Sequence, residues 1–176
     1  MTVTLTDSEL IDGAAAGDAG CIAALVRANQ ARIWRFLVRM LRDHSLAEDV
    51  AQETFIRMVD KLPSWRRDAT FTTWLFQIAR HAAIDAMRKR DRWNRNADLV
   101  ALPSASTDAV SRVEILAALN TLPDQLREAL IMIEVTGLKY REASEVLGVA
   151  EGTLKRRVFD ARQRLADWME EQPDAV

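Results

Sequence analysis

Apolar residues recur at helical spacing along almost the whole chain, and this periodicity limits the possible folds more than any other feature. No sustained alternation of apolar and polar residues predicts a strand. The periodicity is interrupted once, over residues 96–110 (NADLVALPSASTDAV), which contain Pro, Ser and Thr and no basic residue. We therefore predict an all-α protein with two small helical domains, residues 1–95 and 111–172, joined by a flexible linker at 96–110.

A flexible linker of this length would average about 20 Å end to end and would reach about 50 Å at full extension. The two domains could therefore pack together or separate widely.

The charge of the chain is weakly acidic overall but unevenly distributed. The net charge of the 176 residues is −2, which argues against a protein that binds nucleic acid by bulk charge alone. Within each half the bases are clustered, and the two clusters are Arg88, Lys89, Arg90, Arg92 and Arg95, and Lys155, Arg156, Arg157, Arg162 and Arg164. Binding to an anionic partner is therefore expected to be local, or assisted by another protein.

The residue composition also disfavours several classes of protein. Cys21 is the only cysteine, which excludes an internal disulfide and a cysteine-based zinc site. The first residues lack a signal-peptide pattern, and no window resembles a membrane span. We predict a cytoplasmic protein without membrane insertion.

The C-terminal half has the pattern of a helix-turn-helix. A helix is predicted from residues 121–124 to Gly137, where glycine suits a left-handed C-terminal position. A short helix follows over residues 139–148, then a tight turn at Gly148, then a longer helix from Glu151. In that last helix a single buried stripe is predicted, formed by Leu154, Val158, Ala161, Leu165 and Trp168.

Bases lie off this stripe, near the beginning of the last helix: Lys155, Arg156 and Arg157. The N-terminal part of a recognition helix enters the major groove, where Arg or Lys reaches the O6 and N7 atoms of guanine. Gly152 would allow the backbone to approach a phosphate closely. The alternative is a three-helix bundle in which the basic side chains simply form a solvent-exposed face. Ala150 stands where a Ser, Thr or Asp cap is usual.

The N-terminal half predicts helices over residues 7–16 and 19–41, and a third from Ser45 to Pro63. Ser45 and Glu48 have the spacing of a capping box. The first two turns of this third helix are acidic and polar, with Glu48, Asp49, Gln52 and Glu53. This patch fits a favourable interaction with the helix dipole, and it also fits a basic partner surface.

The segment from residue 70 to 95 starts as an apolar, aromatic helix and ends in a run of basic residues. The predicted core positions are Phe71, Trp74, Leu75, Ile78 and Ala82, and the opposite side carries Gln77, Arg80, His81, Ile84 and Arg88. Trp65 and Trp93 are the aromatics best placed for exposure, and aromatics beside Arg suit stacking with unpaired bases. His81 has no second histidine at ligand spacing, so no metal site is predicted.

Five stretches together resemble one family. They are residues 47–58 (AEDVAQETFIRM), 71–90 (FTTWLFQIARHAAIDAMRKR), 122–130 (LPDQLREAL), 137–149 (GLKYREASEVLGV) and 151–165 (EGTLKRRVFDARQRL). In this order they are similar to a bacterial RNA polymerase sigma factor of the extracytoplasmic-function (ECF) group, sigma-70 family. The chain departs from the usual family pattern at His81, where Asn is frequent, and at Trp65, where Phe is more usual.

The resemblance implies a role for each surface. Residues 1–95 correspond to region two, which binds core RNA polymerase and recognises and melts the minus-ten promoter element. The implied partner is core polymerase, through its β′ clamp coiled coil, with the β subunit as a further contact. The residues implied for this binding are Glu48, Asp49, Gln52, Glu53 and Phe55. Those implied for the minus-ten DNA are Trp65, Arg66, Gln77, Arg80, His81 and Arg88. Residues 111–172 correspond to region four, which reads the minus-thirty-five element through Glu151, Gly152, Thr153, Lys155, Arg156 and Arg157.

The implied function is transcription initiation at specific promoters, and the resemblance also implies regulation by an anti-sigma factor. No cofactor and no small-molecule substrate are expected. Two other readings of the residues stay open: a self-sufficient helix-turn-helix repressor or activator, and a helical protein-interaction module. An enzyme is the least favoured reading, because the chain has no Walker loop, no nucleophile elbow and no His-Glu-x-x-His motif.

Overall fold

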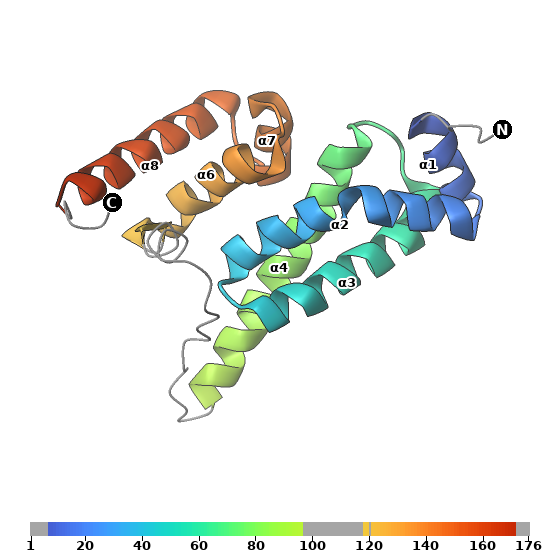
Figure 1. Cartoon of the computed structure of the whole chain (residues 1–176), viewed down its shortest axis with the longest axis horizontal. Helices are drawn as coiled ribbons and strands as arrows, with labels where there is room; N and C mark the ends of the chain where they lie inside the picture. Colours follow the sequence, from blue (N-terminus) through green and yellow to red (C-terminus); the bar gives the residue numbers. More distant parts are fainter. Residues whose placement is uncertain (1–6, 97–117, 120, 172–176) are drawn as a thin grey trace. The chain divides into compact units, whose positions relative to one another are not determined.

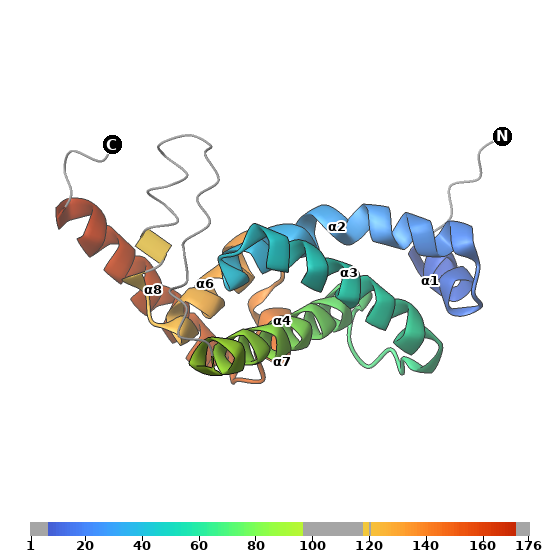
Figure 2. The same cartoon turned by 90° about the horizontal axis from the view of Figure 1, so that it is seen from below.

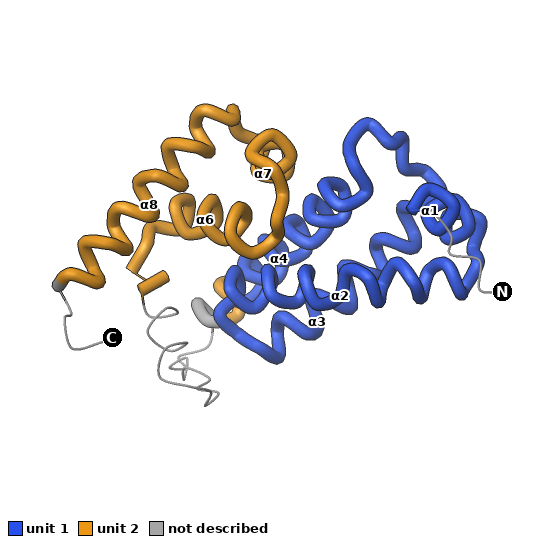
Figure 3. Tube along the Cα trace, turned by 45° about the horizontal axis from the view of Figure 1, so that its top comes forward, with its two compact units in different colours: residues 1–90 blue, residues 91–176 orange. Residues whose placement is uncertain are grey.

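The computed structural model of the chain describes residues 7–96, 118–119 and 121–171, with the side chains of 94–96 and 171 excepted. The chain divides into two compact units, residues 1–90 and 91–176 (Figure 3). Every regular element in the described part is a helix, as the sequence predicts. None of these helices has both the length and the apolar character needed to cross a bilayer.

The first unit contains four α-helices and a short 3-10 turn. They are α1 (Asp7–Ala15), α2 (Ala19–Leu41), α3 (His44–Lys61), η1 (Leu62–Ser64) and α4 (Phe71–Asn96), of which residues 91–96 fall in the second unit. Helices α2 and α3 lie side by side and antiparallel, and α4 crosses them (Figures 1 and 2). Phe36 of α2 meets Phe76 of α4 edge to face, with ring centroids 5.5 Å apart, at the centre of the core. The largest fully buried side chains of this core are Ile33, Phe36, Leu37, Leu41, Met58, Leu75 and Phe76.

The beginning of α3 corrects one prediction. The capping residue is Asp43, whose Oδ1 accepts a hydrogen bond from the backbone N–H of Leu46 at 3.0 Å, and the helix begins at His44. The predicted capping box at Ser45 is therefore wrong. Asp43 has the extended backbone that an N-cap requires, and Ser45 already lies inside the first turn.

A second apolar cluster joins α1 to the segment before α4. Its fully buried members are Ala14, Leu25 and Leu62. The partly buried side chains packed against them are Leu10, Ile11, Ala15, Cys21, Ile22, Trp65, Phe71 and Trp74. This cluster fixes α1 against α2 and η1, and it places an aromatic group where the chain enters α4.

The second unit is built on α6 (Asp124–Thr136), α7 (Tyr140–Leu147) and α8 (Glu151–Glu171). Each of the three helices contacts the other two. Helices α6 and α7 both end at a left-handed glycine: Gly137 at φ 69°, as the sequence predicts, and Gly148 at φ 67°, where the sequence predicts a tight turn. The predicted stripe of α8 is buried at Leu154, Val158 and Ala161, and becomes half-buried at Leu165 and Trp168.

The short α7, the turn at Gly148–Ala150 and the longer α8 form the predicted helix-turn-helix. The predicted linker at residues 96–110 lies outside the described residues apart from Asn96, which ends α4.

Candidate nucleic-acid and protein interfaces

The first turns of α8 present polar side chains and backbone away from the core of the second unit. Leu154 is fully buried and anchors these turns, while Gly152, Thr153, Lys155 and Arg156 are exposed. Glu151 is half-buried at the first helical position. A recognition helix needs this arrangement, because an inward anchor leaves the neighbouring positions free to face a groove.

Three basic side chains of α8 already have partners within the unit. Lys155 Nζ lies 2.6 Å from Glu151 Oε1, and this hydrogen bond, followed by the charge of Glu151, raises the pKa of Lys155. Arg156 makes only a long contact, 3.8 Å, with Asp160. Arg157 is half-buried, and its Nη2 donates to Oε1 of Gln125 on α6 at 2.8 Å. The three bases that the sequence groups together therefore differ in availability, and Arg156 is the most accessible.

Phe159 was not singled out by the sequence pattern. It lies one turn beyond Lys155 on α8, and 66% of it is exposed. An exposed aromatic next to bases on a recognition helix can contact the methyl group of thymine. Its spacing of four residues from Lys155 and three from Arg156 could have identified it.

Helix α4 presents a polar face opposite its buried face. His81 and Arg88 are exposed, and Gln77 and Arg80 are half-buried. Gln77, His81 and Arg88 recur at helical spacing and form one line along this face, and Arg80 lies beside that line, about one turn from Gln77. The structure therefore brings together the four α4 residues that the resemblance implies for the minus-ten DNA.

The two remaining residues of that set, Trp65 and Arg66, lie in the loop between η1 and α4. Trp65 is half-buried, so its predicted exposure is wrong. Its ring stacks on Trp74, with centroids 5.1 Å apart, and meets Phe71 edge to face at 5.9 Å. Arg66 beside it is exposed. Trp93 fits the prediction, because 72% of it is exposed.

A groove of about 470 Å³ lies between α2 and α3. Its walls are formed by Val26, Gln30, Ala31, Trp34, Glu48, Ala51, Gln52 and Phe55. Three of these, Glu48, Gln52 and Phe55, belong to the set implied for core polymerase. The α2 wall was missed, although Trp34 and Gln30 share a helical face and could have indicated it.

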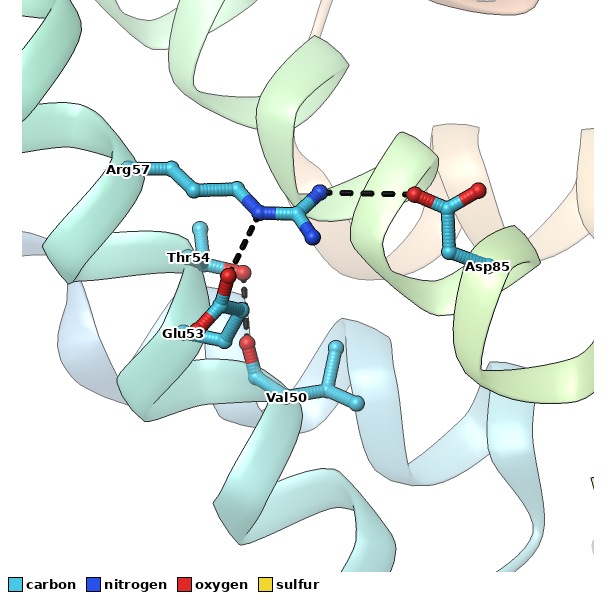
Figure 4. A network of polar contacts seen from close by, with 5 residues as sticks. All are labelled: Val50, Glu53, Thr54, Arg57 and Asp85. Carbon is cyan, nitrogen blue, oxygen red and sulfur yellow. Dashed lines mark hydrogen bonds and ion pairs between the residues drawn. The ribbon is translucent and has the colours of Figure 1, made fainter. Parts of the chain in front are cut away.

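The other two residues of that set lie on α3 outside the groove lining. Asp49 is exposed, and Glu53 is engaged within the protein. Figure 4 shows Arg57 between Glu53, at 2.7 Å from Nε, and Asp85 of α4, at 3.5 Å from Nη1. The hydrogen bond with Glu53 is the largest cause of the raised pKa of Arg57. This network connects the acidic patch of α3 to the polar face of α4.

No group of three His, Cys, Asp or Glu side chains within the described residues is arranged to hold a metal ion.

Known proteins match both units. The family described as Sigma-70 region 2 matches residues 25–92, and Sigma-70, region 4 matches residues 112–165. The ECF RNA polymerase sigma factor SigC of Mycobacterium tuberculosis is 34% identical over 175 residues, covering 94% of each chain. SigM of Bacillus subtilis is 38% identical over 140 residues, covering 76% of this chain and 85% of SigM.

Solved structures agree. RpoE of Bartonella quintana, crystallised with the anti-sigma factor NepR, has a TM-score of 0.75 and 30% identity, covering 84% of this chain and 96% of that one. CnrH, solved with the cytosolic domain of CnrY, shares the fold at a TM-score of 0.73 and 22% identity, over 92% of this chain and 96% of CnrH. The chain belongs to the ECF group of the sigma-70 family, transcription initiation factors that direct RNA polymerase to promoters. The resemblance inferred from the sequence is confirmed.

Proposed function

We propose that this sigma factor docks on core RNA polymerase through the groove between α2 and α3, and that docking makes two separate DNA surfaces act together. The observation that carries the proposal is the position of Glu48, Gln52 and Phe55 on the groove wall. An apolar groove with an acidic and amide rim suits an amphipathic helix with basic flanks. The family's partner at this place, the β′ clamp coiled coil, provides a helical surface of that kind.

The minus-ten surface is assigned to the polar face of α4 together with the loop at Trp65 and Arg66. Exposed His81 and Arg88 are positioned to meet DNA bases and phosphates. Melting requires bases to leave the stack, at a cost of a few kcal/mol that stacking and hydrogen bonding on the protein must offset. The aromatic cluster around Trp74 lies beside the loop and supports this assignment.

The minus-thirty-five surface is assigned to the first turns of α8. Gly152 and Thr153 offer backbone and a hydroxyl close to the helix N-terminus, where a phosphate is favoured. Arg156 provides the side chain for guanine, and Phe159 adds an apolar contact. Glu151, Lys155 and Arg157 complete the surface as residues that also bond within the unit.

Neither DNA surface is expected to be sufficient alone. Because the chain carries a net charge of −2, there is little sequence-independent attraction to DNA. When both surfaces are held on polymerase, the second contact becomes effectively intramolecular. We therefore expect poor binding of the isolated chain to duplex promoter DNA. Submicromolar affinity at physiological salt without polymerase would contradict this.

We also propose that an anti-sigma factor regulates the chain. RpoE of Bartonella quintana, which is 30% identical, was solved in complex with the anti-sigma factor NepR. A protein that covers the α2–α3 groove would prevent docking on polymerase and so silence both DNA surfaces together.

The proposal is tested with the full chain, core polymerase and two matched pairs of variants. Phe55→Ala removes an apolar groove wall and is compared with Phe159→Ala on α8. Gln52→Ala, which changes an exposed glutamine on α3, is compared with Gln163→Ala, which changes an exposed glutamine on α8. A central anchor contributes about 2 kcal/mol to an interface, so Phe55→Ala should weaken core binding about thirtyfold. Gln52→Ala should have a smaller effect, and neither α8 variant should alter core binding.

The same proteins are then tested in run-off transcription on a promoter library. The wild-type chain should select promoters with two separated elements, and Phe159→Ala should lower transcription without lowering core affinity. If the wild-type chain does not bind core polymerase, or if Phe55→Ala binds as tightly as Phe159→Ala, the groove is not the docking site.

A further inference from the structure

The loop between η1 and α4 has an unusual support. The backbone hydrogen bonds end at Trp65, whose N–H donates to the carbonyl of Leu62 at 3.2 Å, and resume at Thr70, whose carbonyl accepts from the N–H of Trp74 at 3.0 Å. Within the described residues, none comes from positions 66–69. The contacts that hold these four residues are therefore sought among the side chains.

Arg67 is the side chain that links the loop to the rest of the unit. Its Nη2 is paired with Oδ1 of Asp12 on α1, and its guanidinium carbon lies 5.9 Å from the centroid of the Trp65 ring. The Trp65 indole N–H is buried and has no acceptor among the described residues. The ring is therefore held by stacking and by Arg67, without a hydrogen bond of its own.

The backbone at Arg67 is also in a conformation that needs support. Its φ is 58°, in the left-handed region that residues other than glycine seldom adopt. Such a conformation persists only where surrounding contacts hold it, and it concentrates at functional sites. Here the contacts come from Asp12 on one side and Trp65 on the other.

We propose that the Asp12–Arg67 pair makes α1 a positioning element for minus-ten selectivity. The pair holds the left-handed turn at Arg67, and the turn sets the direction in which the neighbouring Arg66 faces unpaired bases. Asp12 and Arg67 act through Arg66 and need not touch DNA. This inference depends on the proposed assignment of the loop to the minus-ten surface.

Position 67 allows charge and backbone conformation to be separated. Asn tolerates the left-handed region, so Arg67→Asn removes the ion pair while keeping the turn accessible. Asp tolerates it as well, so Arg67→Asp combined with Asp12→Arg restores the pair with its charges exchanged. Asp7→Asn, at the other end of α1, is the control for loss of one negative charge.

The first measurement is hydrogen exchange, in the full chain, of the Trp65 backbone amide, which is hydrogen-bonded to Leu62 where the loop begins. Exposed ion pairs have modest strength, so Arg67→Asn and Asp12→Asn should each accelerate exchange about two- to fivefold. The charge-exchanged double variant should return the rates toward those of the wild type, and Asp7→Asn should leave them unchanged. Unchanged rates in Arg67→Asn and Asp12→Asn would overturn the proposal.

The second measurement is promoter opening with core polymerase on single-base variants of the minus-ten element. Arg67→Asn and Asp12→Asn should reduce the preference for the best base about two- to fivefold. Preference at the minus-thirty-five element should not change, and the double variant should recover selectivity. A general loss of folding would not produce this pattern, and circular dichroism of each variant provides the check.

Arg66→Ala and His81→Ala distinguish a failure of the positioning role from a failure of the minus-ten surface itself. If these lower promoter opening while Arg67→Asn and Asp12→Asn leave selectivity intact, the positioning role is wrong and the minus-ten surface stands. If Arg66→Ala and His81→Ala also leave opening unchanged, the minus-ten surface itself is wrong, and the positioning role is overturned with it.

Discussion

The basic clusters on α4 and α8 look alike in the sequence but are used differently in the structure. On α4, Arg90 donates from Nη1 to the carbonyl of Leu41 at 3.1 Å and so closes the C-terminal end of α2. Arg88 and Lys89, its neighbours, are exposed and have no ion-pair partner within the described residues. The α4 cluster therefore contains one structural base and others that face outward.

On α8 the structural bases are more numerous. Arg157 donates to Gln125, and Arg162 lies 2.5 Å from Glu134, so both tie α8 to α6. Lys155 is paired along the helix with Glu151. The number of basic residues in a cluster therefore overstates the basic surface that is available to DNA. The overstatement is larger for α8 than for α4. What remains on α8 is Arg156 in its first turns and Arg164 farther along the helix.

The largest expected effect follows from this division. Arg156→Ala should reduce initiation at a cognate promoter about 5- to 150-fold, because a bidentate contact with guanine contributes about 1–3 kcal/mol. Arg157→Ala should instead lower the Tm, because it removes the hydrogen bond to Gln125 that joins α8 to α6. Abortive initiation assays and thermal unfolding of both variants provide the comparison.

Arg164→Ala is the matched control, since it removes an exposed base farther along α8. It should have a small effect on both quantities. The division between reading and structural arginines fails if Arg157→Ala impairs initiation as strongly as Arg156→Ala without changing the Tm.

A smaller effect is expected at the ion pairs between helices. Arg57 joins α3 to α4, and Arg162 joins α8 to α6. Arg57 is the less exposed of the two, with 32% of its side chain accessible against 59%, and it holds two carboxylates. Arg57→Ala should therefore lower the free energy of unfolding by up to about 1 kcal/mol, and Arg162→Ala by less, because solvent screens the more exposed pair more strongly.

Urea unfolding at low and high salt tests this order. Added salt should narrow the difference between wild type and Arg57→Ala, because screening weakens the pair. In a double-mutant cycle, Asp85→Asn should contribute little once Arg57 is absent. Equal losses for Arg57→Ala and Arg162→Ala at both salt concentrations would show that burial does not set the strength of these contacts.

Most of the fold could be predicted because its determinants are local. Apolar spacing located the helices to within a few residues, and Gly137 and Gly148 marked two helix ends. The error at Ser45 has a local cause too. Asp43 and Ser45 are both good capping residues two positions apart, and the choice between them depends on which one has extended backbone.

The surfaces were predictable only in part, because tertiary contacts decide which side chains remain available. The bond from Arg157 to Gln125 spans 32 positions in sequence, and no periodicity indicates it. Trp65 was expected to be exposed because it lies in a loop. The cluster that half-buries it includes Trp74 from α4 and the apolar face of α1, which only the folded chain brings together.

The smallest effect, at Gly152, separates stability from recognition most cleanly. A Cβ added at Gly152 would meet no atom within 4 Å, and the residue lies in the first turn of α8, so nothing within the folded unit requires glycine there. Gly152→Ala should therefore leave the Tm unchanged or raise it, since alanine favours a helix by up to about 1 kcal/mol. If the backbone at this position approaches a DNA phosphate, the added methyl group should weaken initiation severalfold in the same variant. Thermal unfolding and abortive initiation would then move in opposite directions, which a purely structural role of the glycine cannot produce. Initiation that is unchanged or improved would mean that Gly152 is not at the DNA interface, and would limit that interface on α8 to the side chains around Arg156.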